Sequence, residues 1–209
     1  MTEVIKFGIR ALLVVMATMV AAQAAEGDPK AGKEKSAVCQ GCHGEEGISI
    51  APNFPNLAGQ FQKYTERQVL AFRDGKRTDP MMSDMAAGVA ELQDIKDIAA
   101  YYAGKKRMKG APSSNKALAA KGNAIFYKGN ADTGVYACSN CHGENGYGRD
   151  AQNNVFPMIS GQTKDYLVKQ LNDFRSGDRR NDPAGMMGDV AKKMTPAEID
   201  AVAEFVAGM

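Results

Sequence analysis

The sequence has little net charge, few histidines and few cysteines, and alternating apolar and polar residues are scarce. Its 26 basic and 24 acidic residues leave a formal charge of +2 over 209 residues, and no basic stretch is interleaved with aromatic residues. Binding to nucleic acid therefore has no support. The scarcity of alternating patterns argues against a mainly β fold. The chain contains only two histidines and four cysteines.

A hydrophobic run stands at the N-terminus. Lys6 and Arg10 precede the run ALLVVMATMVAA at positions 11–22, and small residues follow it. This layout is typical of a secretory signal peptide, and the run is shorter than the roughly 20 apolar residues that a membrane-spanning helix needs. We expect residues 1–25 to be a signal peptide cleaved before Glu26, with a retained N-terminal anchor as the alternative. Either way, the remainder is predicted to be exported.

The exported part consists of two similar halves. The segment NFPNLAGQ at 53–60 recurs as VFPMISGQ at 155–162, and a Met-Met pair follows each copy. We expect two homologous domains, 26–103 and 116–209, joined by a polar linker rich in Gly, Pro and Ser at 104–115. Because domains of this size are small, something besides a protein core is expected to help hold each one together.

Helical patterns dominate both halves. The sequence TPAE at Thr195–Glu198 is a capping box with Pro at the first helical position, and apolar residues follow at one-face spacing. A matching helix is expected over 92–102. A middle helix in each half is expected to stop at Gly75 or Gly177, since glycine suits a C-terminal cap. The predicted fold class is all-α, with two tandem domains and long loops.

All the cysteines and histidines of the chain fall in two copies of the motif Cys-x-x-Cys-His. The copies comprise Cys39, Cys42 and His43, and Cys138, Cys141 and His142. This motif marks the attachment of c-type haem. Two thiols three positions apart can form thioether bonds to the two vinyl groups, and the adjacent histidine then faces the iron. We predict two covalently bound haem c groups, each with its motif histidine as an iron ligand.

Three other interpretations of the cysteines are weaker. Four cysteines in an exported chain would by default form two disulfides, but disulfides leave the two adjacent histidines unexplained. A thioredoxin-like pair would need a βαβ pattern, which the sequence lacks. A zinc site would need ligands outside an adjacent Cys-His pair. Two matches at equivalent places of a duplicated chain favour haem.

The number of histidines limits which residue can be the second axial ligand of each iron. Two histidines cannot ligate two irons from both sides, so this ligand is methionine, a weaker group or none. We select the second member of each Met-Met pair, Met82 and Met187, because each aligns with a shared downstream pattern. Ligation by His and Met suits electron-transfer cytochromes and raises the reduction potential. The alternatives are Met81, Met85, Met186 and Met194, which could instead pack in the core or the haem pocket.

Two repeated residue pairs are candidates for supporting roles. A proximal histidine commonly donates its other ring N–H to a carbonyl, which fixes the tautomer. Pro55 and Pro157, downstream of each histidine, are candidates to supply the accepting carbonyl, although a simple loop turn explains them almost as well. For Tyr64 and Tyr166 we favour packing between helices.

The chain closely resembles the dihaem cytochrome c4 family of bacterial class I c-type cytochromes. The resemblance spans essentially the whole exported region through CQGCHGEEG, APNFPNLAGQ and FRDGKRTDPMM in the first half and CSNCHGENGYG, FPMISGQ and FRSGDRRNDPAGMM in the second. It implies two cytochrome c-like folds that face each other across a pseudo-twofold interface. It also implies a periplasmic location, often at the membrane surface, and four iron ligands: His43, Met82, His142 and Met187.

The expected function is one-electron transport in a periplasmic respiratory chain, without substrate turnover by the chain itself. The resemblance implies delivery of electrons towards a terminal oxidase, and a quinol-oxidising complex or another cytochrome is the expected donor. A dihaem enzyme such as a peroxidase would need an open iron position, yet both halves offer a methionine. A haem-based gas sensor, or a permanent oxidase subunit, is the remaining alternative.

Overall fold

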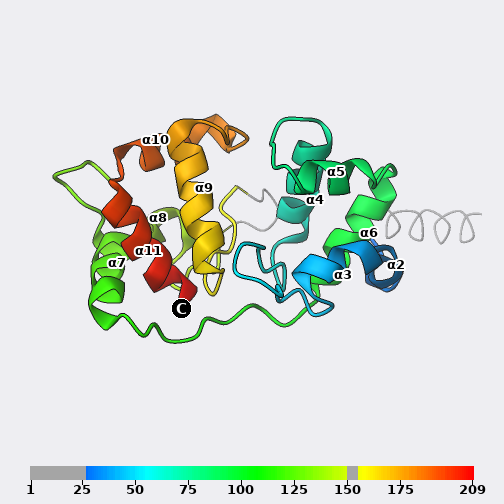
Figure 1. The fold of residues 1–209 in the computed structure, drawn as a ribbon, viewed down its shortest axis with the longest axis horizontal. Coiled ribbons are helices and arrows are strands. Elements are labelled where there is room, and N and C mark those ends of the chain that lie inside the picture. Colours follow the sequence, from blue (N-terminus) through cyan, green and yellow to red (C-terminus); the bar gives the residue numbers. More distant parts are fainter. Residues whose placement is uncertain (1–26, 150–154) are drawn as a thin grey trace, which may run out of the picture.

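The computed structural model describes residues 27–149 and 155–209, and the predicted signal peptide lies outside these residues. Two helical halves lie side by side, joined by a long connecting segment (Figure 1). Within the described ranges, β-structure is limited to two isolated bridges, Asn130 with Val135 and Arg149 with Phe156. The predicted all-α fold with two tandem domains is confirmed. No helix in the described ranges is long and apolar enough to cross a membrane.

The N-terminal half is built around contact between its first and last helices. Its helices are α2 (Pro29–Lys35), α3 (Ala37–His43), α4 (Gln62–Arg73), α5 (Met82–Ala87) and α6 (Leu92–Ala103). Asp28 caps α2 by accepting from the Lys30 N–H, and Pro29 occupies the first helical position. The buried Asp97 of α6 accepts hydrogen bonds from the Asp28 N–H and from Lys35, so α2 is fixed across α6.

The C-terminal half repeats this plan. Its helices are α7 (Lys116–Lys128), α8 (Ser139–His142), α9 (Lys164–Ser176), the short 3-10 turn η1 (Pro183–Gly185), α10 (Met186–Lys193) and α11 (Pro196–Ala207). The predicted capping box is present at the start of α11, where Thr195 and Glu198 cap each other's backbone N–H. Gly177 ends α9 in the left-handed conformation, with φ 86°, as its position in the sequence suggested.

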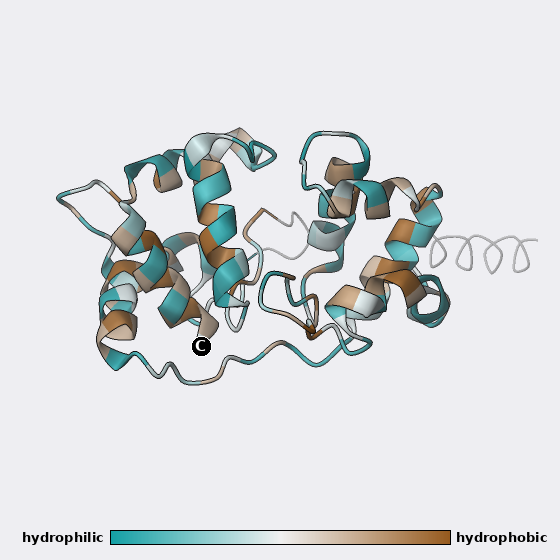
Figure 2. Cartoon of the chain, in the orientation of Figure 1, coloured by the Kyte–Doolittle hydropathy of each residue, from teal (hydrophilic) through white to brown (hydrophobic). Residues whose placement is uncertain are grey.

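The apolar cores of the two halves differ in size. In the C-terminal half, Phe126 of α7 and Ile199 and Val202 of α11 belong to a cluster of buried side chains that also receives Met194. In the N-terminal half, the buried cluster consists of Ile98, Tyr101 and Tyr102, with Cys39, Leu57 and Val89 packed against it. Figure 2 shows apolar and polar residues sharing the helices of both halves. Both clusters adjoin a Cys-x-x-Cys-His motif, because Cys39 packs on one and Cys138 on the other.

The segment 104–115, which we predicted to be a linker, has no helix or strand and runs along one side of both halves (Figure 1). It is nevertheless held in place. The Met108 side chain is buried and its N–H donates to Ala58, while the Gly110 N–H donates to the carbonyl of Met209. The connection is therefore bonded to the first half and to the end of the second.

Buried polar side chains join the two halves with near twofold symmetry. Arg77 donates to Tyr166 and Gln170 of the other half, and Arg179 donates to Tyr64 and Gln68. Each arginine also bonds the glutamine of its own half, at 2.8 Å in both cases. The tyrosines and glutamines project from α4 and α9, and the arginines follow these helices. Both buried arginines therefore bond uncharged side chains, some of them in their own half and some in the other half.

Candidate functional site

Each Cys-x-x-Cys-His motif lies on a short helix that ends at its histidine. In the first half α3 carries Cys39, Cys42 and His43, and helical spacing places residues three apart on one face. The second motif begins at Cys138, the N-cap of the one-turn helix α8. The glycine after each histidine has a positive φ, 75° in the first half and 81° in the second, which ends the helix.

The four thiols are free, as covalent attachment of haem requires. Burial raises the pKa of Cys39, and it raises the pKa of Cys138 to about 11. Cys42 is half-buried and Cys141 is exposed. One thiol of each pair therefore faces the interior, and the other lies nearer the surface.

Both motif histidines are buried and oriented by a proline carbonyl. Nδ1 of His43 lies 2.8 Å from the oxygen of Pro55, and Nδ1 of His142 lies 2.9 Å from that of Pro157. The predicted roles of the two prolines as hydrogen-bond acceptors are confirmed. Since a carbonyl only accepts, the proton sits on Nδ1 and leaves Nε2 as the nitrogen available to a metal.

The protonation state of the histidines also suits metal binding. Burial lowers the pKa of His43 and of His142, and the opposing effect of the proline carbonyl is smaller. The imidazoles are therefore neutral near neutral pH, and only the neutral ring can ligate a metal through Nε2.

In the N-terminal half, Met82 is better placed as an interior ligand than its neighbours. Met81 and Met85 are 48% and 45% exposed, whereas Met82 is half-buried. The backbone N–H of Met82 donates to Asp79 at 3.1 Å, which fixes the start of α5. The Met81 N–H donates to the same Asp79 oxygen, also at 3.1 Å, so burial of the side chain rather than this bond distinguishes Met82.

The C-terminal half repeats this arrangement with a longer loop. The N–H of Met187 donates to Asp182 at 2.8 Å, so an aspartate again caps the helix that carries the candidate ligand. Ala184 and Gly185 both have positive φ and form the extra turn before it. The side chain of Met194 is buried in the apolar core, as the alternative interpretation of that residue proposed.

These features fit haem c. Each half offers two thiols three positions apart, a neutral imidazole with its proton fixed on Nδ1, and a half-buried thioether. An open hollow of about 410 Å³ lies beside the first motif, with both apolar residues such as Val38 and Ile98 and charged residues such as Asp94 in its lining. The lining includes no motif residue and not Met82, so this hollow is not assigned to the haem.

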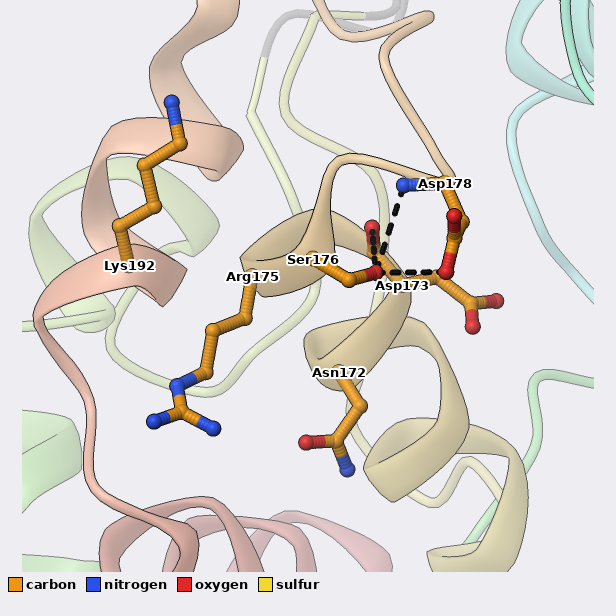
Figure 3. Close-up of a pocket in the computed structure, with 6 residues that line it drawn as sticks. All are labelled: Asn172, Asp173, Arg175, Ser176, Asp178 and Lys192. Carbon is orange, nitrogen blue, oxygen red and sulfur yellow. Dashed lines mark hydrogen bonds between the residues drawn. The ribbon is translucent and has the colours of Figure 1, made fainter.

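A second open hollow, of about 540 Å³, has a different character. Figure 3 shows its lining at the end of α9 and on α10: Asn172, Asp173, Arg175, Ser176, Asp178 and Lys192. Ser176 donates to Asp178 at 2.7 Å within this group. The lining includes no motif residue and no candidate axial ligand, so this hollow is not one of the haem sites.

The residues that join the halves were missed by the sequence analysis. For Tyr64 and Tyr166 we favoured simple packing, but each hydroxyl accepts a hydrogen bond from an arginine of the opposite half. Gln60 and Gln162 also cross the interface, to Met158 and Asn56. Their repetition at one constant spacing was a usable signal, because polar residues repeated at matching places of two halves are candidates for a symmetric interface.

Comparison with known proteins agrees with this geometry. The family model for cytochrome c matches residues 29–103 and 119–209. Cytochrome c4 of Pseudomonas aeruginosa is 41% identical over 186 residues, covering 88% of this chain and 90% of the relative. A protein of Thiomonas intermedia named thiosulfate dehydrogenase electron acceptor is 35% identical, covering 85% of this chain and 81% of the relative.

A solved structure shares both halves and their arrangement. The crystal structure of reduced recombinant cytochrome c4 from Pseudomonas stutzeri superposes with a TM-score of 0.81 at 39% identity. It covers 88% of this chain, and 99% of its own chain is matched. The chain therefore belongs to the cytochrome c family and, within it, to the cytochrome c4 family of dihaem electron carriers, with two covalently bound haem c groups.

Proposed function

We propose that each half holds one haem c through the residues of its own motif and methionine pair. In the N-terminal half, Cys39 and Cys42 would anchor the haem, with His43 and Met82 as the iron ligands. The corresponding set in the C-terminal half is Cys138, Cys141, His142 and Met187. The observation that carries this assignment is the pair of buried histidines, each with Nδ1 bonded to a proline carbonyl and Nε2 left for iron.

The role of the protein is to hold each centre unchanged while an electron arrives or leaves. Haem supplies a one-electron couple between ferric and ferrous iron when it is bound. The proline carbonyls keep the imidazoles in one tautomer and raise their basicity. Hydrogen bonds to Asp79 and Asp182 fix the starts of the helices that carry Met82 and Met187, whose thioethers would serve as the second iron ligands. A site with both axial positions filled by the protein is suited to electron transfer rather than to turnover of a substrate.

A reductive titration tests the carrier function. Purified protein should contain two haems per chain, take up two electrons per chain reversibly, and return both to an oxidant without consuming any other substrate. Uptake of one electron per chain would contradict the proposal, as would rapid turnover of hydrogen peroxide, since turnover needs an open iron position.

For the partners, we propose a terminal oxidase as acceptor and a quinol-oxidising complex or another cytochrome as donor. A second donor is suggested by the Thiomonas intermedia relative, whose name describes it as an electron acceptor of thiosulfate dehydrogenase. Stopped-flow mixing separates these candidates. Oxidised protein is mixed with each donor enzyme and its substrate, and reduced protein with the oxidase. A physiological pair should react far faster than it does after one partner is replaced by an unrelated redox protein.

We also propose that the chain works in the periplasm, at or near the membrane surface, after removal of residues 1–25. The apolar N-terminal run and the family membership support export. Mass spectrometry of protein from the periplasmic fraction should find a mature chain that begins at Glu26 and carries two haems. Recovery of the full-length chain only from membranes would instead support a retained anchor.

A further inference from the structure

Two buried glutamines each reach across the interface to one residue of the opposite half. Nε2 of Gln60 donates to the Met158 carbonyl at 2.8 Å, and Oε1 of Gln60 accepts from the Met158 N–H at 3.1 Å. Reciprocally, Nε2 of Gln162 donates to the Asn56 carbonyl at 2.9 Å, and its Oε1 accepts from the Asn56 N–H at 2.7 Å. Each side-chain amide thus binds both backbone polar groups of its target.

The two targets directly follow the prolines that orient the histidines. Met158 comes after Pro157, whose carbonyl receives Nδ1–H of His142, and Asn56 comes after Pro55, whose carbonyl receives Nδ1–H of His43. The carbonyl of a residue and the N–H of the next belong to one planar peptide group. A bond to the Met158 N–H therefore also fixes the direction of the Pro157 carbonyl.

The same peptide group also transmits polarisation. A peptide whose N–H donates a hydrogen bond becomes a stronger acceptor at its carbonyl, because chains of hydrogen bonds reinforce one another. Gln60 accepts on one side of the 157–158 peptide and His142 donates on the other. Gln162 and His43 stand in the same relation to the 55–56 peptide.

We propose that Gln60 and Gln162 are positioning residues that act across the interface: Gln60 sets the orientation and hydrogen-bond strength of His142, and Gln162 those of His43. Each half would thereby tune the proximal ligand of the other. This inference rests on the proposed function, in which the two histidines ligate iron. It goes further by assigning control of each haem to a residue on the opposite half.

The proposal predicts an effect in the half that does not contain the substitution. In Gln60→Met the side chain keeps a similar length and its neutral charge, but Met158 loses both of its bonds to Gln60, including the bond to the N–H of the 157–158 peptide. The weaker bond to His142 makes that imidazole a poorer electron donor, so ferric iron is less stabilised. The midpoint potential of the C-terminal haem should rise, and that of the N-terminal haem should stay unchanged. Gln162→Met should raise only the potential of the N-terminal haem.

Isotope labelling of the histidines provides a second measurement of the same effect. With two histidines in the sequence, protein labelled with 15N-histidine gives two ring signals, one from each haem site. His43 can be assigned through its contact with Phe54, whose ring centroid lies 6.3 Å away. In the reduced holoprotein, Gln60→Met should shift the Nδ1–H signal of His142 and speed its exchange with deuterium, while the His43 signal stays in place.

Asn181→Ala is the matched control, because it removes a 2.9 Å hydrogen bond from Asn181 to Gln68 across the interface without touching either histidine peptide. It should leave both Nδ1–H signals and both potentials unchanged. If Gln60→Met does not fold, Gln60→Asn replaces it, since the shorter amide cannot reach both the N–H and the carbonyl of Met158. Gln162→Met tests the corresponding effect on His43.

The outcomes separate this inference from the function on which it rests. If Gln60→Met shifts the N-terminal haem, both haems equally or neither, or if Asn181→Ala has the same effect, the positioning role is wrong. If the wild-type ring signals lack the large displacement that binding to haem iron produces, the ligand assignment itself is wrong. The former result leaves the carrier function intact, whereas the latter does not.

Discussion

The assignment of the sulfur ligand depends on one position in each Met-Met pair. Met82 and Met187 are half-buried, whereas Met81 and Met186 are 48% and 37% exposed. An aspartate accepts a hydrogen bond from the backbone N–H of both chosen residues, but Asp79 accepts one from Met81 as well, so burial is the observation that separates the members of the first pair. The histidines and methionines were inferred from their types and spacing, because the chemistry of an iron site restricts which side chains can serve.

Replacing one of the proposed methionine ligands should leave an axial position open on one haem iron. In Met82→Ala, the N-terminal iron should lose the sixth ligand proposed for it, so half of the haem in the sample should become high-spin and bind carbon monoxide when reduced. Met187→Ala should do the same in the C-terminal half. The potential of the affected haem should fall, since methionine ligation raises it. Optical titration with carbon monoxide measures the reactive fraction.

The neighbouring methionines serve as controls for this experiment. Met81→Ala and Met186→Ala remove similar side chains one residue away and should leave both haems unreactive towards carbon monoxide. A gain of carbon monoxide binding in Met81→Ala, with none in Met82→Ala, would move the ligand by one residue.

A buried carboxylate makes part of the stability depend on pH. Burial of Asp97 would raise its pKa, but hydrogen bonds from Lys35, the Asp28 N–H and Gln93 together hold the pKa below its usual value. An aspartate whose pKa is lowered in the folded state stabilises the fold above its unfolded pKa, about 3.9. This stabilisation is lost as the pH falls through the lower, folded value.

Asp97→Asn should therefore lower the free energy of unfolding by about 2 kcal/mol at pH 7 and weaken its dependence on pH below about 4. Asp94→Asn is the control, because Asp94 also pairs with Lys35 but is 36% exposed, and its loss should cost less than about 1 kcal/mol. Urea unfolding followed by circular dichroism at several pH values measures both. Equal losses for the two variants would contradict the role assigned to burial.

At the scale of elements, long helices with clear signals were predicted and short ones were not. The capping box at Thr195 and the glycine stop at Gly177 are local patterns, and both occur as expected. The first motif lies on α3, whose seven residues make only about two turns, fewer than the roughly 11 residues over which a helical period is recognised. The helix α7 was also not predicted, because its alanine-rich sequence has few large apolar residues to mark a buried face.

The end of the motif helix α3 provides a test at this scale. Gly44 has φ 75°, and a Cβ there would lie 2.2 Å from the carbonyl oxygen of Ile48. Gly44→Ala should lower the free energy of unfolding by at least about 1 kcal/mol, because both the backbone and the space oppose a side chain. Gly41→Ala, three residues earlier within the same helix, should instead stabilise by roughly 0.5 kcal/mol, since nothing lies within 4 Å of its Cβ position.

Thermal unfolding of the two glycine variants, followed by circular dichroism, measures the difference. The two substitutions add the same methyl group, so opposite signs isolate the effect of backbone conformation. A loss of stability in Gly41→Ala as large as that in Gly44→Ala would show that the helix does not end as the structure has it.

At the scale of the whole molecule, the halves are joined through buried polar groups. Arg77, Arg179, Gln68 and Gln170 are all buried and bonded across the twofold-like interface. The repeat in the sequence predicted two similar domains, and its repeated polar residues marked candidates for an interface, but it did not show which residues pair across that interface. Pairing between distant residues depends on the folded surfaces of both halves, and a pattern within one half does not encode it.

Removing one of the buried arginines should uncouple the halves. Arg179→Met removes the donor to the Tyr64 hydroxyl and one of the donors to Gln68 and to Gln170, and the free energy of unfolding should fall by about 3 kcal/mol. In differential scanning calorimetry, a single wild-type transition should separate into two as the halves lose their contact.

The next residue along the chain is the matched control for this loss. Arg180→Met removes the same charge from an exposed position whose guanidinium bonds only the Gly177 carbonyl among the contacts described, so stability should change by less than about 0.5 kcal/mol. If both variants melt alike, the buried network does not hold the halves together.

The most direct test of the account is the optical spectrum of the purified protein, oxidised and reduced, with haem counted per chain and carbon monoxide added to the reduced form. Two low-spin haems per chain, a far-red methionine–iron band in the oxidised form and no response to carbon monoxide are predicted by two His–Met sites. A high-spin fraction or rapid binding of carbon monoxide would contradict the account, because an electron carrier of this design leaves no axial position open.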